Sequence, residues 1–260
     1  MINFTCLKWG TKYDSEYVNR LYTMIKRNCD VEFQLHCCTE DASNIREEVN
    51  IIPLPEHLYL ETYWWKLWIT SNEFPIKGKC VFFDLDIVIQ NNLQELVDYE
   101  CGGMLYILNA KWRSEYIKKI GKTIKLTSTN SSVMLWNSSV RVDAGLEKFI
   151  KDPEFYMTKY VGNDNYLEFE LPGQYKTLPI EWVYCRVFGY DETDEDRFSY
   201  AVDIYDIGLG DMQLKLYRIP DRMICLFNGI DSEDIDYRIY DGFEHYWSDS
   251  MSDTISSHIH

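Results

Sequence analysis

Short apolar runs alternate with helical patterns in the first third of the chain. Ile2–Leu7 is an apolar run of the kind that forms a buried strand, and Asp14 or Ser15 is placed to cap the amphipathic helix that follows. The next β-rich runs are Val31–Cys38 and Val49–Leu54, a short aromatic helix is expected at Tyr63–Ile69, and Lys79–Phe83 has the continuous apolar character of a covered central strand. This order predicts the opening of an α/β sheet.

The second half of the chain is less regular. Strands are predicted at Met104–Leu108 and Ser132–Trp136, helices at Asp143–Ile150 and Asn163–Phe169, a surface insertion at Asp191–Asp211 and a loose polar tail at 248–260. No repeat or low-complexity linker divides the sequence. We therefore expect one α/β domain over residues 1–247, with halves at 1–100 and 101–247 and a mixed central sheet flanked by helices.

Composition and charge narrow the range of partners. Acidic residues outnumber basic ones by 42 to 26, and a net charge of −16 disfavours nucleic acid and anionic lipid as partners. The basic stretch Lys111–Lys125 is expected to form the solvated face of a surface helix. No window resembles a membrane span and the start shows no charged leader, so a cytoplasmic protein is expected.

Two further features of the composition refine that expectation. The eight cysteines contain no Cys-x-x-Cys pair, which predicts reduced, mostly buried thiols, with Cys37 and Cys38 on opposite faces of a strand. Only four alanines stand against 20 tyrosines, which suggests an AT-rich coding sequence of viral or protist type. A virus-encoded protein in the host cytoplasm would fit both observations.

Asp84 and Asp86 follow the predicted central strand directly. Two residues apart in extended backbone, both carboxylates would point to one side and offer hard oxygen ligands to one divalent cation. Ligands of open α/β sheets bind beyond the carboxyl ends of the strands, where this pair is expected. Other Asp-x-Asp patterns, at 194–196 and 234–236, lack the preceding apolar run. A metal site at Asp84 and Asp86 is the prediction, and two strand-end capping aspartates are the alternative.

Several segments together resemble the GT-A glycosyltransferases, including the glycogenin-like family eight. In order along the chain they are Cys6–Tyr13, Trp65–Lys66, Phe82–Ile89, Asn130–Met134, Gly162–Leu167, Leu178–Tyr184 and Cys225–Gly229. Each motif is loose by itself, and the shared order over residues 1–247 carries the resemblance. It implies a GT-A (Rossmann-like) fold, with a donor half at 1–100 and an acceptor half at 101–247.

The resemblance also implies a reaction and a set of site residues. A sugar would pass from a nucleoside-diphosphate sugar, expected to be a UDP-sugar such as UDP-glucose, to an unknown glycan, protein or small-molecule acceptor, with Mn²⁺ or Mg²⁺ on the diphosphate. Carried over by position, donor binding falls to Trp9, Gly10, Tyr13, Lys66, Asp84, Leu85, Asn130, Ser131, Ser132 and Gly229, metal binding to Asp84, Asp86 and Asn228, and catalysis to Asp164. Asn228 replaces the family's usual His, and Asn163-Asp164-Asn165 replaces its acid, amide, acid pattern.

Other readings of the same residues remain open at this stage. An apolar strand ending in Asp-x-Asp also resembles the nucleophile motif of haloacid-dehalogenase-like phosphatases, in which Asp84 would attack phosphorus. A third possibility is a GT-A scaffold that binds carbohydrate or nucleotide without turnover. Lys66 can be read as a lysine that reaches into water along an aromatic helix, and Trp64, Trp65 and Trp68 are read as core rather than sugar platforms.

Overall fold

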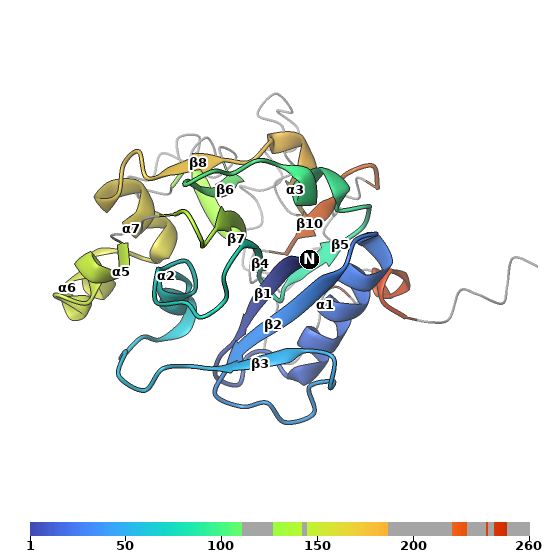
Figure 1. Cartoon of the computed structure of the whole chain (residues 1–260), viewed down its shortest axis with the longest axis horizontal. Coiled ribbons are helices and arrows are strands. Elements are labelled where there is room, and N and C mark those ends of the chain that lie inside the picture. The colour runs from blue at the N-terminus through green and yellow to red at the C-terminus, as the bar shows by residue number, and fades with distance from the viewer. Residues whose placement is uncertain (111–126, 142–144, 187–219, 228–237, 239–241, 249–260) are drawn as a thin grey trace, which may run out of the picture.

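The main sheet of the molecule is mixed and has seven strands (Figure 1). The computed structural model describes residues 1–110, 127–141, 145–186, 220–227, 238 and 242–248. The strand order is β3-β2-β1-β4-β7-β6-β8, and the strands are β1 (Ile2–Lys8), β2 (Phe33–Thr39), β3 (Asn50–Pro53), β4 (Lys79–Phe83), β6 (Leu105–Asn109), β7 (Thr129–Asn137) and β8 (Tyr175–Thr177). The first four strands run parallel, whereas β7 is antiparallel to both of its neighbours, β4 and β6.

A second, three-stranded sheet begins immediately after β4. Its central strand β10 (Ile224–Leu226) pairs antiparallel with β5 (Ile87–Ile89) and parallel with β9 (Val183–Cys185). Because only three residues separate β4 from β5, the chain passes from the large sheet to the small one in a single turn that contains Asp84 and Asp86.

Helices cover the two faces of the main sheet. Helix α1 (Ser15–Asn28) begins at Asp14, whose carboxylate accepts a hydrogen bond from the Glu16 N–H, and its apolar stripe is fully buried. The other helices are α2 (Trp65–Ile69), α3 (Gln94–Asp98), α5 (Gly145–Phe149), α6 (Pro153–Lys159) and α7 (Asn163–Glu170). Figure 1 shows α1 on one side of the sheet and α2, α5, α6 and α7 together on the other.

The alternation of side chains along each strand builds two cores. Cys37 belongs to the core under α1 and Cys38 to the core under α2, α5 and α7, as predicted for adjacent residues of one strand. Phe82 and Phe83 of β4 divide between the two cores in the same way. Each such aromatic side chain contributes roughly 1.5–3 kcal/mol by leaving water, so β4 is anchored from both faces.

The fold class predicted from the sequence is confirmed, and the strands and helices predicted in residues 1–100 lie within about two residues of those observed. The tryptophans of the aromatic segment are buried, and all eight cysteines are free thiols, seven of them buried. Helices α3 and α6 and strand β8 were not anticipated. The predictions for 111–125, 191–211 and most of the tail fall outside the described residues, as do the first residues of the helix expected at Asp143–Ile150.

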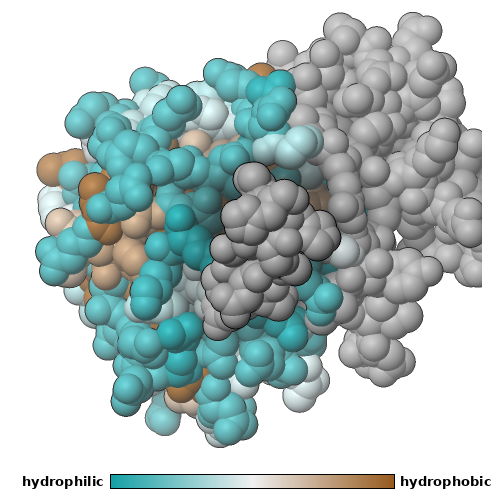
Figure 2. Space-filling view, turned by 90° about the vertical axis from the view of Figure 1, so that its right-hand side faces the viewer, coloured by the Kyte–Doolittle hydropathy of each residue, from teal (hydrophilic) through white to brown (hydrophobic). Residues whose placement is uncertain are grey.

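The described part of the chain contains no helix with the length and apolar character needed to cross a membrane. On the face shown in Figure 2, hydrophilic residues dominate and the hydrophobic ones form only small areas. This surface agrees with a charged fraction of 26%, which is ordinary for a globular protein.

Candidate active site

Asp84 and Asp86 lie in the turn that joins the two sheets. The Asp84 N–H donates to the Ser132 carbonyl oxygen at 2.8 Å, which extends the β4–β7 ladder by one residue, and the Phe227 N–H donates to the Asp86 carbonyl oxygen at 3.1 Å. Leu85 and Asp86 have turn conformation. The prediction of extended backbone through both aspartates was therefore wrong, because the chain must change sheets between them.

Leu85 occupies the turn with its side chain in the core. It is 2% exposed and belongs to the cluster beneath α1, while its carbonyl oxygen accepts a hydrogen bond from Arg238 Nη1 at 2.8 Å. Only the backbone of Leu85 can therefore face a ligand in the turn. The buried side chain fixes the turn to the core, which limits the freedom of the two flanking carboxylates.

Lys66 forms an ion pair with Asp84. Its Nζ lies 2.7 Å from Oδ1 and 2.8 Å from Oδ2 of Asp84, and it also donates to the Ser131 carbonyl oxygen at 3.3 Å and to Ser131 Oγ at 3.2 Å. The Lys66 side chain is only 6% exposed. The interpretation of Lys66 as a lysine that reaches into water was therefore wrong. All residues of α2 are buried, and the Lys66 ammonium group contacts Asp84 at the end of β4.

The electrostatics of this pair favour a bound cation. Burial raises the pKa of the Asp84 carboxyl above its ordinary value, the Lys66 ammonium lowers it, and the neighbouring Asp86 carboxylate raises it again. Two adjacent, largely buried carboxylates repel each other, and Lys66 offsets only part of that repulsion. A divalent cation near both carboxylates would relieve the remainder.

A break in the β6–β7 ladder leaves buried polar groups of β7 next to Lys66 outside the regular strand pairing. Ile107 pairs with Met134 and Leu108 with Asn130, so the register shifts between them. The Ser132 N–H is satisfied instead by Asn130 Oδ1 at 2.7 Å. Irregular pairing of this kind directs side chains and N–H groups away from the sheet, and it is common beside active sites.

The start of helix α7 lies against this irregular segment. Asp164 Oδ1 accepts a hydrogen bond from the Ser131 N–H at 3.0 Å, and Asn163 Oδ1 accepts one from Ser131 Oγ at 3.3 Å. Later in the helix, Glu168 accepts from the Ser128 N–H at 3.0 Å, which holds α7 along β7. Hydrogen bonds thus connect Asp84, Lys66, Ser131 and Asp164, four residues that the sequence assigned to one site.

Asn163 was noted in the sequence only as a departure from the family pattern. It is 3% exposed, and among the described residues its Nδ2 is a buried amide nitrogen with no hydrogen-bond partner. Leaving such a donor unsatisfied costs roughly 1–3 kcal/mol, which a ligand oxygen would recover. The spare amide donor therefore adds Asn163 to the residues able to contact a polar ligand.

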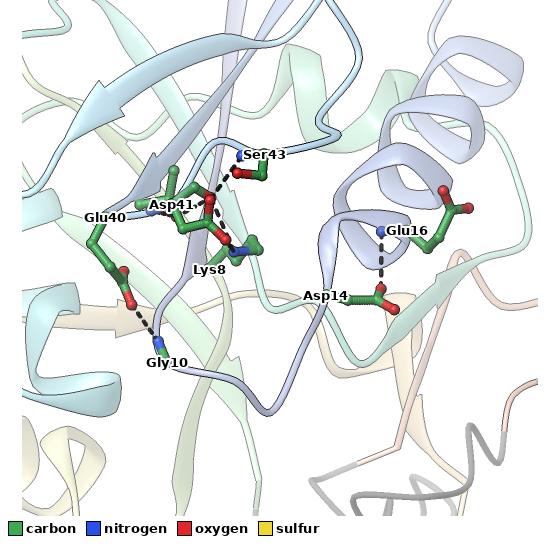
Figure 3. Close-up of polar contacts among 8 residues, drawn as sticks. Lys8, Gly10, Asp14, Glu16, Glu40, Asp41 and Ser43 are labelled. Atoms are coloured by element: carbon green, nitrogen blue, oxygen red, sulfur yellow. Dashed lines mark hydrogen bonds and ion pairs between the residues drawn. The ribbon is translucent and has the colours of Figure 1, made fainter.

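The loop after β1 is joined to the end of β2 (Figure 3). Lys8 Nζ contacts Asp41 at its carbonyl oxygen, 3.0 Å, and at Oδ2, 3.3 Å, while Glu40 Oε1 accepts from the Gly10 N–H at 2.6 Å. Gly10 has a φ of +66°, a conformation that a side chain would strain. Sequence reasoning missed Glu40 and Asp41, although parallel pairing of Lys8 with Thr39 brings the residues after both strands together.

Tyr13, from the same loop, reaches the turn between the two sheets. Its hydroxyl donates to Asp86 Oδ2 at 3.2 Å. Trp9 is partly buried and packs against the core under α2, α5 and α7, whereas Tyr13 packs against the core under α1. Asn228 and Gly229, predicted for the metal shell and the donor, lie outside the described residues.

The number and type of protein ligands around Asp84 and Asp86 indicate which kind of cation site is possible here. Within the described ranges, no group of three His, Cys, Asp or Glu residues is placed to hold a metal ion. Two aspartates nevertheless fit Mg²⁺, which is commonly held by one or two carboxylates together with substrate phosphates and water. The residues present are therefore suited to a cation that arrives with a diphosphate rather than to a closed protein metal site.

Comparisons with known proteins agree on the fold. Neither a scan against protein-family models nor a search of curated proteins finds a match. Among solved structures, the glycosyltransferase GlyE of Streptococcus pneumoniae TIGR4 matches with a TM-score of 0.55 and 16% identity over 89% of this chain. This chain spans only 55% of the GlyE chain.

Two other glycosyltransferases match over nearly their whole length. The galactosyltransferase LgtC, solved with donor and acceptor sugar analogues, has a TM-score of 0.55 and 14% identity, covering 88% of this chain and 87% of LgtC. Mouse xyloside xylosyltransferase 1 has a TM-score of 0.51 and 14% identity, covering 87% of this chain and 97% of the enzyme. The chain has the GT-A glycosyltransferase fold.

The GT-A fold weakens the phosphatase reading. Lys66 contacts both carboxylate oxygens of Asp84, a contact that either family could use. The strand before Asp84 also pairs antiparallel with β7 in a mixed sheet, as expected here for a GT-A fold. The Asp-x-Asp pattern alone could not distinguish the two folds, and the surrounding strands do.

Proposed function

We propose that this protein is a metal-dependent glycosyltransferase that moves a sugar from a nucleoside-diphosphate sugar to an acceptor. The observation that carries the proposal is the Lys66–Asp84 pair beside Asp86 at the carboxyl end of β4, on a GT-A fold. The donor is proposed to be a UDP-sugar, with glucose as the first sugar to test. The motif order that resembles the glycogenin-like family supports this choice.

Asp84 and Asp86 are the residues proposed to hold Mn²⁺ or Mg²⁺, with Asn228 as a further oxygen ligand. When bound, the cation neutralises the charge that builds on the nucleoside diphosphate as it leaves the sugar. Lys66 contributes a second positive charge at the same place, and its burial makes that charge more effective than it would be in water.

The sugar of the donor is proposed to lie between β7 and the start of α7. The spare amide donor of Asn163 would bind a sugar oxygen, and Asn130 and Ser132 would line the same pocket. Asp164, at the start of α7, is the carboxylate proposed to contact a sugar hydroxyl or the reacting centre. Trp9, Gly10 and Tyr13 would receive the nucleoside, with Gly229 and the Leu85 backbone also contributing to the donor site.

Titration of UDP into the protein, with and without Mn²⁺, tests the proposal. We expect binding that requires Mn²⁺ and is abolished by Asp86→Ala. Asp98→Ala is a matched control, because it removes an exposed carboxylate from α3, outside the site. Metal-dependent binding that persists in Asp86→Ala would show that the site is assigned to the wrong residues.

Turnover separates an enzyme from a scaffold that only binds. Incubation with UDP-glucose and Mn²⁺ should release UDP, slowly to water and faster when a suitable acceptor is present. Asp164→Asn should reduce the rate while retaining UDP binding, since Asp164 is assigned to the sugar and not to the diphosphate. Tight UDP binding without release of UDP from any UDP-sugar would favour the scaffold.

A further inference from the structure

Tyr13 links two parts of the proposed site that are distant in the sequence. It stands in the loop after β1, and its hydroxyl donates to Asp86 Oδ2 at 3.2 Å across 73 residues of chain. The Tyr13 ring packs on the ring of Tyr17, with centroids 4.9 Å apart, and Lys12 Nζ lies 4.9 Å from its centroid. Tyr17 and Lys12 thus contact the Tyr13 ring, while the position of its hydroxyl follows the conformation of the loop that carries it.

The hydrogen bond to Asp86 restrains the orientation of its carboxylate. Asp86 lies in a turn, where backbone geometry alone would leave its side chain several rotamers. The Tyr13 hydroxyl favours the rotamer that presents Oδ2 to it. Partners of this kind around ligating carboxylates commonly determine metal affinity.

We infer that Tyr13 is a positioning residue that couples nucleoside binding in the β1 loop to cation binding at Asp86. This inference rests on the proposed function, because it takes the β1 loop as the nucleoside site and Asp86 as a cation ligand. A nucleoside that orders the loop fixes the Tyr13 hydroxyl and with it Asp86. Coupling between two sites is reciprocal, so the cation must strengthen nucleoside binding by the same factor.

The coupling predicts an effect that separates Tyr13 from residues that merely pack. Tyr13→Phe keeps the ring and its contacts and removes only the hydroxyl. A hydrogen bond to a charged group changes a binding constant by a factor of roughly ten or more. A bound cation shares the charge of the Asp86 carboxylate, which reduces the factor for the bond from Tyr13. We expect Tyr13→Phe to lower the Mn²⁺-dependent gain in UDP affinity by roughly 5- to 10-fold.

The experiment measures three ligands by calorimetry: uridine, UDP without metal and UDP with Mn²⁺. Bound Mn²⁺ is counted independently from the loss of the electron paramagnetic resonance signal of the aqueous ion. Tyr22→Phe is the matched control, since it removes a phenol hydroxyl from the same N-terminal region, where the Tyr22 ring packs on Phe33 of β2. Thermal unfolding of both variants verifies that each is folded.

The outcomes are distinct. Tyr13→Phe should lose roughly 5- to 10-fold of the gain in UDP affinity that Mn²⁺ confers and a smaller factor of its affinity for uridine, while Tyr22→Phe should behave as the wild type. An unchanged Mn²⁺ gain in Tyr13→Phe, or an equal loss for uridine and for UDP with Mn²⁺, would overturn the coupling and leave the proposed function standing. If the wild type itself shows no Mn²⁺ dependence, the proposed function fails, and the coupling fails with it.

Discussion

His36 makes the stability of the protein sensitive to acid. It is 5% exposed on β2, and its two ring nitrogens bond to asparagines on the neighbouring strands, Nε2 to Asn3 Oδ1 at 3.1 Å and Nδ1 to Asn50 Nδ2 at 2.8 Å. The Asn3 amide nitrogen donates to the carbonyl oxygens of Lys77 and Lys79, so its oxygen is left to accept. This network fits a neutral imidazole with its proton on Nε2.

The cost of protonating His36 follows from its pKa. Burial lowers the pKa of His36 from 6.5 to about 4. Between these values the unfolded chain binds a proton and the folded chain does not, so stability is full above about pH 6.5 and falls as the pH drops towards about 4. At 1.36 kcal/mol for each pKa unit, the whole loss is about 3 kcal/mol, of which about 2 kcal/mol is lost by about pH 5.

Denaturant unfolding at about pH 7 and about pH 5 measures this loss. His36→Gln should flatten the pH dependence by about 2 kcal/mol relative to the wild type, whereas His57→Gln, at a largely exposed histidine, should not. Asn50→Asp places a carboxylate at Nδ1, raises the pKa of His36 and should also flatten the curve. If wild type and His36→Gln lose stability in parallel between the two pH values, the reasoning is refuted.

Three further predictions concern the site and its surroundings. Lys66→Met leaves the Asp84 carboxylate without its lysine partner and should lower the free energy of unfolding, measured with denaturant, by about 2 kcal/mol, a value reduced for the partial exposure of Asp84. Adding Asp84→Asn to this variant should recover most of that loss. Glu170 forms ion pairs with two lysines, and its pKa is lowered to about 2, chiefly by the hydrogen bond from Lys148. The stability that the Glu170 carboxylate contributes is therefore present above pH 4.5 and is lost as the pH falls towards about 2. Because both lysines are well exposed, Glu170→Gln should cost only about 1 kcal/mol at neutral pH and should remove this dependence from acid unfolding curves. Gly162→Ala would place a Cβ 3.3 Å from the Tyr63 ring and should lower stability by about 1 kcal/mol in thermal unfolding, and an unchanged melting temperature would contradict it.

The parallel strands β1, β2 and β4 could be predicted from sequence because they are buried along most of their length. Lys79–Phe83 is covered on both faces, so it reads as an apolar run, and the stripe of α1 repeats at helical spacing over about two turns, from Val18 to Ile25. Strands β9 and β10 are three residues long, and each depends on a partner, because β10 pairs with β5 and β9 pairs with β10. A three-residue strand has no period of its own, so its presence depends on partners elsewhere in the chain.

The candidate site was predictable in its residues and much less so in its contacts. The Asp-x-Asp pattern and the motif order indicated Lys66, Asp84 and Asp164 before any contact was known. The ion pair between Lys66 and Asp84 depends on how α2 packs against the sheet, which no local pattern encodes. Asn163 escaped notice as a binding residue because an asparagine at a helix start is ordinary, and only its burial reveals the spare amide donor.

The turn that carries Asp84 and Asp86 has a consequence for how this protein can vary. Asp84 is tied to one sheet through Ser132 and Asp86 to the other through Phe227, so the distance between the carboxylates records how the two sheets are seated on each other. Under the proposed function, substitutions buried between the sheets would change that distance and with it the affinity for a cation. Related chains could then adjust their metal preference by repacking this interior while keeping both aspartates.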